Sequence, residues 1–66
     1  MQIFINGSAT EVEASIPMSA LVEQLGLTGR RIAVEVNAEL VPRSRFAQHV
    51  LVPEDRVEII QAVGGG

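Results

Sequence analysis

The spacing of apolar residues changes along this chain, and the points of change restrict the folds that it can adopt. Residues 2–6 alternate, with Ile3 and Ile5 on one face of an extended segment and Phe4 on the other. The dipeptide Asn6-Gly7 follows, and between two alternating segments it predicts a tight hairpin turn. We therefore expect the sequence to open with a β-hairpin.

The second strand of this hairpin is predicted over residues 10–14. Because side chains alternate between the two faces of a strand, Val12 and Ala14 would face the core. Glu11 and Glu13 would then face solvent, where charged side chains are usually found.

Beyond Pro17 the apolar spacing becomes helical. Four residues fall at i, i+3, i+4 and i+7, on one stripe of a helix: Met18, Leu21, Val22 and Leu25. Pro17 suits the first turn, where its missing N–H costs little. Gly26 can end the helix in a left-handed conformation, which lets Leu27 fold back onto the core. These features predict one helix of two to three turns.

Alternation returns over residues 32–37 and 56–63, which predicts two more strands. In the first, Ile32, Val34 and Val36 point one way. In the last, Val57 and Ile59 would point inward and three residues outward: Glu58, Ile60 and Ala62.

Between these strands we expect a turn at 37–39, a short strand at Leu40-Val41 that Pro42 keeps at a sheet edge, and a helical turn within 43–48. Residues 53–55 read as a solvated turn. The order of elements predicts an α+β fold, with one main helix packed on one face of a mixed sheet of four to five strands.

Composition limits the chain to one small domain and excludes several kinds of chemistry. With 66 residues, 47% of them apolar, there is room for a single core. Cysteine is absent, which excludes disulfides, thiolate metal sites and thiol catalysis. The net charge is −3, and the aromatic residues are two Phe, so neither nucleic acid nor an anionic membrane surface is an expected partner.

No metal site and no enzyme active site is expected either. Glu54 and Asp55 are neighbours in a turn and would diverge, and His49 has no second metal ligand near it in sequence. No apolar run reaches the roughly 20 residues that cross a bilayer. The opening Met1-Gln2-Ile3-Phe4 lacks the features of a secretory signal, so we expect a cytoplasmic protein.

Three glycines, Gly64, Gly65 and Gly66, follow the last predicted strand. We therefore divide the chain into a domain at 1–63 and a flexible glycine tail at 64–66. One interpretation is an incidental frayed end. The other starts from the terminal carboxylate, which is a poor electrophile until an enzyme converts it to an acyl-adenylate with ATP. A glycine tail is thin enough to enter the narrow site where that happens.

Several stretches of the chain resemble one family closely. They are Met1-Gln2-Ile3-Phe4, Val36-Asn37, Val41-Pro42-Arg43-Ser44-Arg45-Phe46-Ala47, Asp55-Arg56-Val57-Glu58-Ile59 and Val63-Gly64-Gly65-Gly66. Together they resemble the ThiS family, the sulfur carriers of thiazole formation in thiamine biosynthesis, within the ubiquitin-like β-grasp superfamily. The chain departs from the family at Phe46, commonly Trp, and at Pro53-Glu54-Asp55, commonly Asp-Gly-Asp.

The resemblance implies a co-substrate rather than an enzyme. The working group would be the Gly66 carboxylate, with Gly64 and Gly65 threading the partner's active site. An E1-like adenylyltransferase would activate Gly66 with ATP and Mg²⁺, a cysteine desulfurase or other persulfide donor would supply sulfur, and thiazole synthase would receive it from the thiocarboxylate. The carrier itself would bind no cofactor and would be a monomer when free.

We also expect a docking patch beside the tail. Phe4 and Ile60 point outward from strands that are neighbours in a β-grasp sheet, and Ala62 follows on the same side. A contiguous apolar patch beside a functional tail suggests a surface for partner binding.

Other interpretations stay open at this point. The chain could be the small subunit of molybdopterin synthase or the carrier of another pathway, such as cysteine synthesis. It could instead be a protein modifier that forms isopeptide bonds, or a β-grasp interaction module in which the tail has no role.

Overall fold

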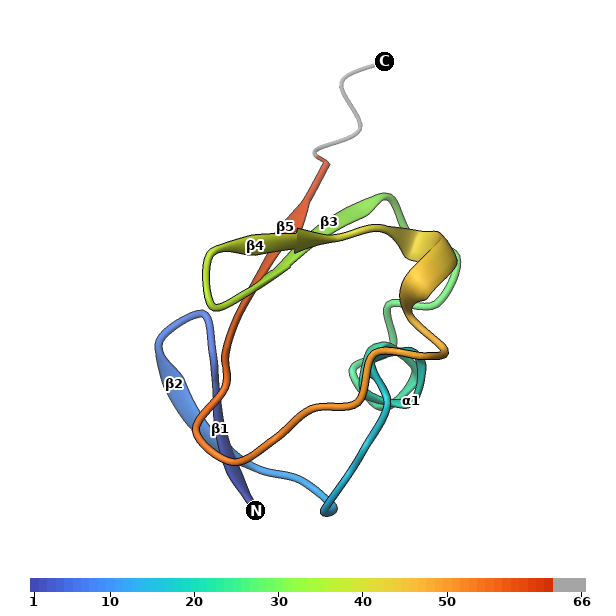
Figure 1. Cartoon of the computed structure of the whole chain (residues 1–66). Coiled ribbons are helices and arrows are strands. Elements are labelled where there is room, and N and C mark those ends of the chain that lie inside the picture. Colours follow the sequence, from blue (N-terminus) through green and yellow to red (C-terminus); the bar gives the residue numbers. More distant parts are fainter. Residues whose placement is uncertain (63–66) are drawn as a thin grey trace.

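The computed structural model describes residues 1–62, in which five strands form one sheet of order β2-β1-β5-β3-β4 (Figure 1). The elements are β1 (Gln2–Ile5), β2 (Ser8–Glu11), α1 (Met18–Gln24), β3 (Ile32–Val36), β4 (Glu39–Val41), the 3-10 helix η1 (Arg43–Arg45) and β5 (Arg56–Gln61). Strands β1 and β5 are parallel, and the other neighbouring pairs are antiparallel. The predicted α+β fold with a mixed sheet is confirmed.

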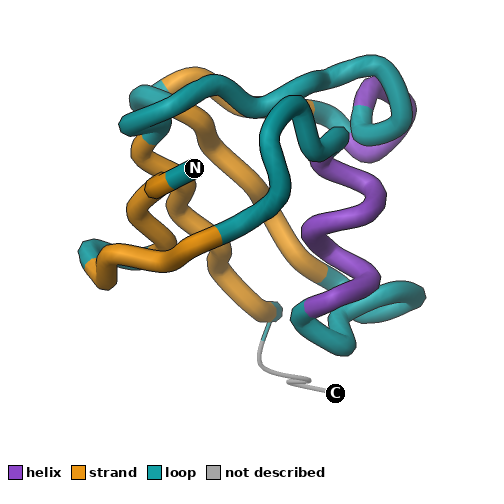
Figure 2. The backbone as a smooth tube through the Cα atoms, turned by 90° about the horizontal axis from the view of Figure 1, so that it is seen from below, coloured by secondary structure: helices purple, strands orange, loops and turns teal. Residues whose placement is uncertain are grey.

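Helix α1 lies on one side of the sheet, which Figure 2 shows from below. The other face of the sheet carries the outward residues of every strand; we call it the outer face. The helix and the segment from Pro42 to Val52 complete the fold on the inner side, where the buried apolar residues gather.

Two hairpins with two-residue turns set the register of the sheet. Asn6 and Gly7 both have positive φ, 49° and 84°, as the Asn-Gly signal predicts for a turn that matches the twist of the strands. Asn37 and Ala38 do the same between β3 and β4, with φ of 52° and 70°. Ala38 is unusual there, because its Cβ is strained in the left-handed region.

The second strand begins earlier than the sequence pattern predicts. Because the turn ends at Gly7, strand pairing with β1 starts at Ser8 and ends at Glu11, and beyond it Met1 and Val12 exchange two backbone hydrogen bonds. The prediction of a strand at 10–14 is therefore shifted by two to three residues. The inward placement of Ala14 is wrong, since that residue is exposed, while Val12 packs against the edge of the core.

Helix α1 ends one residue before the predicted stripe does. Met18, Leu21 and Val22 are buried, but Leu25 is the C-cap and is 39% exposed. The Gly26 N–H donates to the Glu23 carbonyl and the Leu27 N–H to the Val22 carbonyl, both at 3.0 Å. With Gly26 at φ 73°, this is the Schellman arrangement expected of that glycine.

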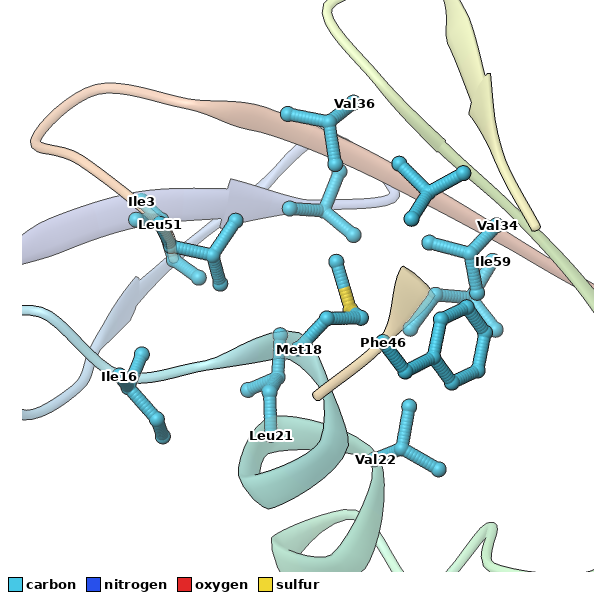
Figure 3. Packing of buried hydrophobic residues seen from close by; sticks show 12 residues of the cluster. Ile3, Ile16, Met18, Leu21, Val22, Val34, Val36, Phe46, Leu51 and Ile59 are labelled. Atoms are coloured by element: carbon cyan, nitrogen blue, oxygen red, sulfur yellow. The ribbon is translucent and has the colours of Figure 1, made fainter. Parts of the chain in front are cut away.

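The core is a single aliphatic layer between the sheet and α1, shown in Figure 3. Six side chains in it are almost fully buried: Ile3, Met18, Leu21, Leu51, Val34 and Val57. Phe46, directly after η1, is the aromatic member of this layer and is 8% exposed. Burial of each large apolar side chain contributes about 1.5–3 kcal/mol, so the loss of one removes a large share of the stability of so small a domain.

Leu51→Ala should therefore destabilise the domain by about 2–5 kcal/mol, because it opens a cavity in the aliphatic layer. Leu51 is 1% exposed, whereas its neighbour Val52 is 54% exposed. Val52→Ala is thus a matched control, and we expect it to change the free energy of unfolding by less than about 0.5 kcal/mol. Urea denaturation of both variants measures the difference; equal effects would contradict the core assignment.

Candidate functional site

The strand that leads to the glycine tail is the central strand of the sheet. β5 pairs with β3 from Val57 to Gln61, and on its other side with β1 at Arg56 and Val57. Beyond Val57 the backbone ladder with β1 has ended, because β1 stops at Ile5. The second half of β5 therefore needs other partners on that side.

Asn6 supplies one of those partners. Its side-chain amide makes two hydrogen bonds with the backbone of Ile59: the Ile59 N–H donates to Oδ1 at 2.8 Å, and Nδ2 donates to the Ile59 carbonyl at 3.2 Å. The amide thus takes the place that the next residue of β1 would occupy. The sequence indicated Asn6 as a turn residue, and nothing in it showed this second role.

Asn37 and Asp55 fix the beginning of β5. The Asp55 carboxylate accepts hydrogen bonds from Asn37 Nδ2 at 3.0 Å and from the Val52 N–H at 2.9 Å. The Arg56 N–H donates to Asn37 Oδ1 at 3.0 Å, and the Asn37 N–H donates to the Arg56 carbonyl at 2.8 Å. Asp55 is only 6% exposed. The predicted solvated turn is therefore right for Glu54, which is exposed, and wrong for Asp55.

At the other end of β5, Ala62 lies beside three arginines, Arg30, Arg31 and Arg43. The Ala62 N–H donates to the Arg31 carbonyl at 2.9 Å, and Arg43 Nη2 donates to the Arg30 carbonyl at 2.6 Å. A shallow hollow of about 360 Å³ lies there, lined by Arg31, Ile32, Ala33, Arg43, Ile60 and Ala62. The predicted site residues Gly64, Gly65 and Gly66 lie outside the described residues.

Comparison with known proteins now identifies the family. The model of the ThiS family matches residues 3–66. The chain belongs to the ThiS family. The crystal structure of the thiamine biosynthesis protein ThiS from Geobacter metallireducens has a TM-score of 0.86 and 28% identity, with each chain covered in full. The ubiquitin-like β-grasp fold that the sequence resemblance implied is thereby confirmed.

Two further relatives show how ThiS-like sequences occur. The sulfur carrier protein ThiS of Escherichia coli is 33% identical over 66 residues, which is 100% of both chains. A thiazole synthase of Paramagnetospirillum magneticum is 41% identical over the same 66 residues, which make up 20% of that protein. The chain thus spans about a fifth of that relative's length, as it does for the thiazole synthase of Magnetococcus marinus.

The docking patch predicted for this ThiS-family chain is not contiguous. β1 and β5 are neighbours, as expected, but Phe4 pairs with Arg56, four positions before Ile60. Four residues of strand span about 13 Å. Glu58 lies between them on the outer face, and the Arg56 guanidinium lies over the half-buried Phe4 ring, 5.1 Å from its centroid. Ile60 and Ala62 are exposed, and a docking role for these residues stays a prediction.

The sequence analysis also considered His49 as a metal ligand. His49 is half-buried, and its carbonyl accepts a hydrogen bond from the Met18 N–H at 2.8 Å. Residues 1–62 contain no group of three acidic, His or Cys side chains placed to hold a metal ion. Within the same residues, α1 is far too short to cross a bilayer, and no other helix could do so.

Asn6→Gly should isolate the contribution of the Asn6 amide, because glycine adopts the positive φ of this turn without strain. We expect a loss of about 1–2 kcal/mol in the free energy of unfolding. We also expect faster hydrogen exchange at the Ile59 amide, which loses its acceptor. Asn6→Asp is the matched comparison, since it keeps that acceptor and removes the donor. Unchanged exchange at Ile59 in the glycine variant would contradict the assigned role.

Proposed function

We propose that this chain is a sulfur carrier of thiamine biosynthesis and that the Gly66 carboxylate holds the sulfur as a thiocarboxylate. Membership of the ThiS family and the full-length similarity to the Escherichia coli sulfur carrier support the carrier role. The observation on this chain that carries the proposal is the sequence Gly64-Gly65-Gly66 two residues after β5, a central strand that pairs with a neighbour on each side. A fixed strand followed by residues without side chains presents a carboxylate to a narrow site.

The chemistry takes place in three steps at the Gly66 carboxylate. First, a carboxylate oxygen attacks the α-phosphorus of ATP, and pyrophosphate leaves, which gives an acyl-adenylate. Next, a sulfur nucleophile from a persulfide donor attacks the carbonyl carbon, and AMP leaves with the electrons of the broken C–O bond. A thiol then cleaves the remaining S–S bond and leaves one sulfur on carbon, as the thiocarboxylate.

The partners follow from this chemistry. An adenylyltransferase would bind ATP and Mg²⁺, and a cysteine desulfurase would form the persulfide, so the carrier needs no cofactor of its own. Thiazole synthase as the sulfur acceptor is supported by two proteins of that name in which a fifth of the length resembles this whole chain. Because activation consumes ATP, we propose that the carrier works in the cytoplasm as a monomeric co-substrate.

Intact mass spectrometry tests the proposal directly. The chain is incubated with an adenylyltransferase, Mg²⁺, ATP and a persulfide donor. We expect the mass gained when sulfur replaces one oxygen, mapped to Gly66 and absent when Gly66 is deleted. An unchanged mass, with an adenylyltransferase shown to be active on another carrier, would contradict the carrier role. Transfer of the sulfur to a molybdopterin precursor rather than to thiazole would assign the chain to a different pathway.

Gly65→Val should slow the loading of sulfur by about a hundredfold, because a branched side chain misplaces the reacting carboxylate in a narrow site. Residue 65 follows β5 in sequence, so the melting temperature should not change. Thr28→Val, at an exposed position in the loop before β3, is the control for adding an apolar side chain. Equal loading rates for the two variants would indicate that the tail does not thread a confined site.

A further inference from the structure

A second hollow, of about 580 Å³, lies along β4, which is the last strand of the sheet (Figure 1). Its volume is within the range of roughly 300–1,000 Å³ found for ligand sites. It shares no lining residue with the hollow beside Ala62. β4 and Pro42 line it, together with five residues of the segment that follows: Arg45, Gln48, His49, Val50 and Val52.

Exposed apolar side chains gather around this hollow. Five large apolar residues of the described chain are exposed, and three of them line it: Leu40 at 67%, Val52 at 54% and Val50 at 48%. Single exposed apolar residues are normal on a protein surface, whereas a group of them beside a hollow marks an interaction site. The hollow therefore has the apolar lining that a bound peptide needs.

The backbone of Leu40 has an unpaired donor and an unpaired acceptor at this edge. A two-residue turn joins β3 to β4, so the flanking residues Val36 and Glu39 exchange both of their hydrogen bonds. The next pair, Leu40 with Glu35, is then a non-hydrogen-bonded pair. The N–H and carbonyl of Leu40 point away from β3, and no other part of residues 1–62 binds either group.

Val50 has unpaired backbone groups as well. It pairs with Pro17 in an isolated antiparallel bridge. The carbonyl of His49 and the N–H of Leu51 make the hydrogen bonds of this bridge, at 2.8 and 2.9 Å. The N–H and carbonyl of Val50 itself therefore point away from Pro17, and no group of the described chain binds them. Two lining residues of the hollow thus have backbone groups available to an added strand.

Charges of opposite sign lie at the two ends of β4. Glu39 begins the strand, and Arg45 is in η1, beyond its end. Both are exposed, and both line the hollow. Within residues 1–62, the one ion pair joins the N-terminus to Glu11, so neither charge has an ion-pair partner. A bound segment that carries an acidic residue near Arg45 and a basic residue near Glu39 would pair both.

We propose that the hollow beside β4 binds an extended segment of a partner protein, which adds a sixth strand to the sheet, antiparallel to β4. The segment exchanges two hydrogen bonds with Leu40, and its apolar side chains contact Val50 and Val52. Because it is antiparallel, its acidic residue comes first and reaches Arg45. Its basic residue comes last and reaches Glu39. Acidic, apolar, polar, apolar, polar, basic is the order of residues that the hollow fits.

A second copy of this chain fits the edge less well. Two β4 strands paired about a two-fold axis at Leu40 would place Glu39 opposite Val41 of the second copy, so the carboxylate would stay unpaired. The charges at the two ends of β4 therefore favour a different protein as the occupant. The inference does not depend on the proposed carrier function, since the segment contacts neither the tail nor the end of β5.

Two synthetic hexapeptides, acetylated and amidated at their ends, test the proposal by NMR titration of the full chain. The first is Glu-Val-Thr-Val-Thr-Lys, and the second, Lys-Val-Thr-Val-Thr-Glu, has its charges reversed. We expect a dissociation constant of about 1 mM for the first, because a few contacts have to offset the ordering of the peptide. The second should bind about fivefold more weakly, since both of its charges face like charges.

Amide exchange locates the added strand. With 10 mM of the first peptide, exchange of the Leu40 amide should slow by about tenfold. The amides of Ala9 and Glu11 are the internal control, because they hold the equivalent non-hydrogen-bonded positions at the opposite edge of the sheet, in β2. Their exchange rates should not change. Unchanged exchange at Leu40 with both peptides would overturn the proposal.

The charge-swap variant E39R/R45E tests the orientation, because it exchanges the two charges and keeps the net charge. It should prefer the second peptide by about fivefold. E23R/R30E is the matched control, at exposed positions that do not line the hollow, and should keep the wild-type preference. Equal binding of the two peptides to the wild type, or a wild-type preference in E39R/R45E, would contradict the proposed occupant.

Sedimentation of the free chain covers self-association. A monomer whose Leu40 amide exchanges rapidly without peptide agrees with an edge open to a partner. A dimer in which the Leu40 amide is already protected would assign the edge to a second copy and overturn the proposal. Because the peptides are tested without ATP or an adenylyltransferase, each of these results leaves the carrier function to its own mass-spectrometric test.

Discussion

The pairing of the first strand with the last is the interaction on which the rest of this structure depends. β1 and β5 are more than 50 residues apart in sequence, and they meet as a parallel pair only two register positions long, Phe4 with Arg56 and Ile5 with Val57. The closure of so long a loop has a considerable entropic cost. The amide of Asn6 lengthens this short ladder by binding Ile59 through both its oxygen and its nitrogen. Both hairpins, and the core between the sheet and α1, are joined through that contact.

Two asparagines with positive φ thus serve the same strand from opposite sides. Asn6 ends the β1 side of the first hairpin, and Asn37 begins the turn between β3 and β4. The side chain of each asparagine binds the backbone of β5: Asn6 binds Ile59, and Asn37 binds Arg56. Asparagine suits both tasks because it tolerates the left-handed conformation and carries a donor and an acceptor in one planar group.

Features that depend on local backbone geometry could be predicted from the sequence, whereas features that depend on contacts between distant residues could not. The first hairpin turn and the helix end at Gly26 depend on local backbone geometry, and local residue types indicated both. The burial of Asp55 depends on Asn37, 18 residues away, and the exposure of Ala14 depends on the register of β2, whose pairing with β1 ends at Glu11. Neither dependence is visible in the spacing of apolar residues, since both follow from the register of strands distant in sequence. The docking patch was predicted as contiguous for a similar reason. The sequence indicated that β1 and β5 are neighbours, but not that Phe4 pairs with Arg56 rather than with a residue nearer Ile60.

In the proposed carrier, the residues that stabilise the domain differ from the residues that react. The aliphatic layer and the two asparagines stabilise β5, whereas the residues proposed to react follow it in sequence and need no side chains. The outer face holds a pairing that like charges disfavour, Glu35 opposite Glu58. In a domain whose total stability is only about 3–10 kcal/mol, a repulsive pair at the centre of the sheet is tolerated because the inner face of the same strands is so well packed. Val34 and Val57, which are in the same strands as the acidic pair, are at most 1% exposed. Packing on the inner face of the sheet thus stabilises β3 and β5 independently of the residues on the outer face.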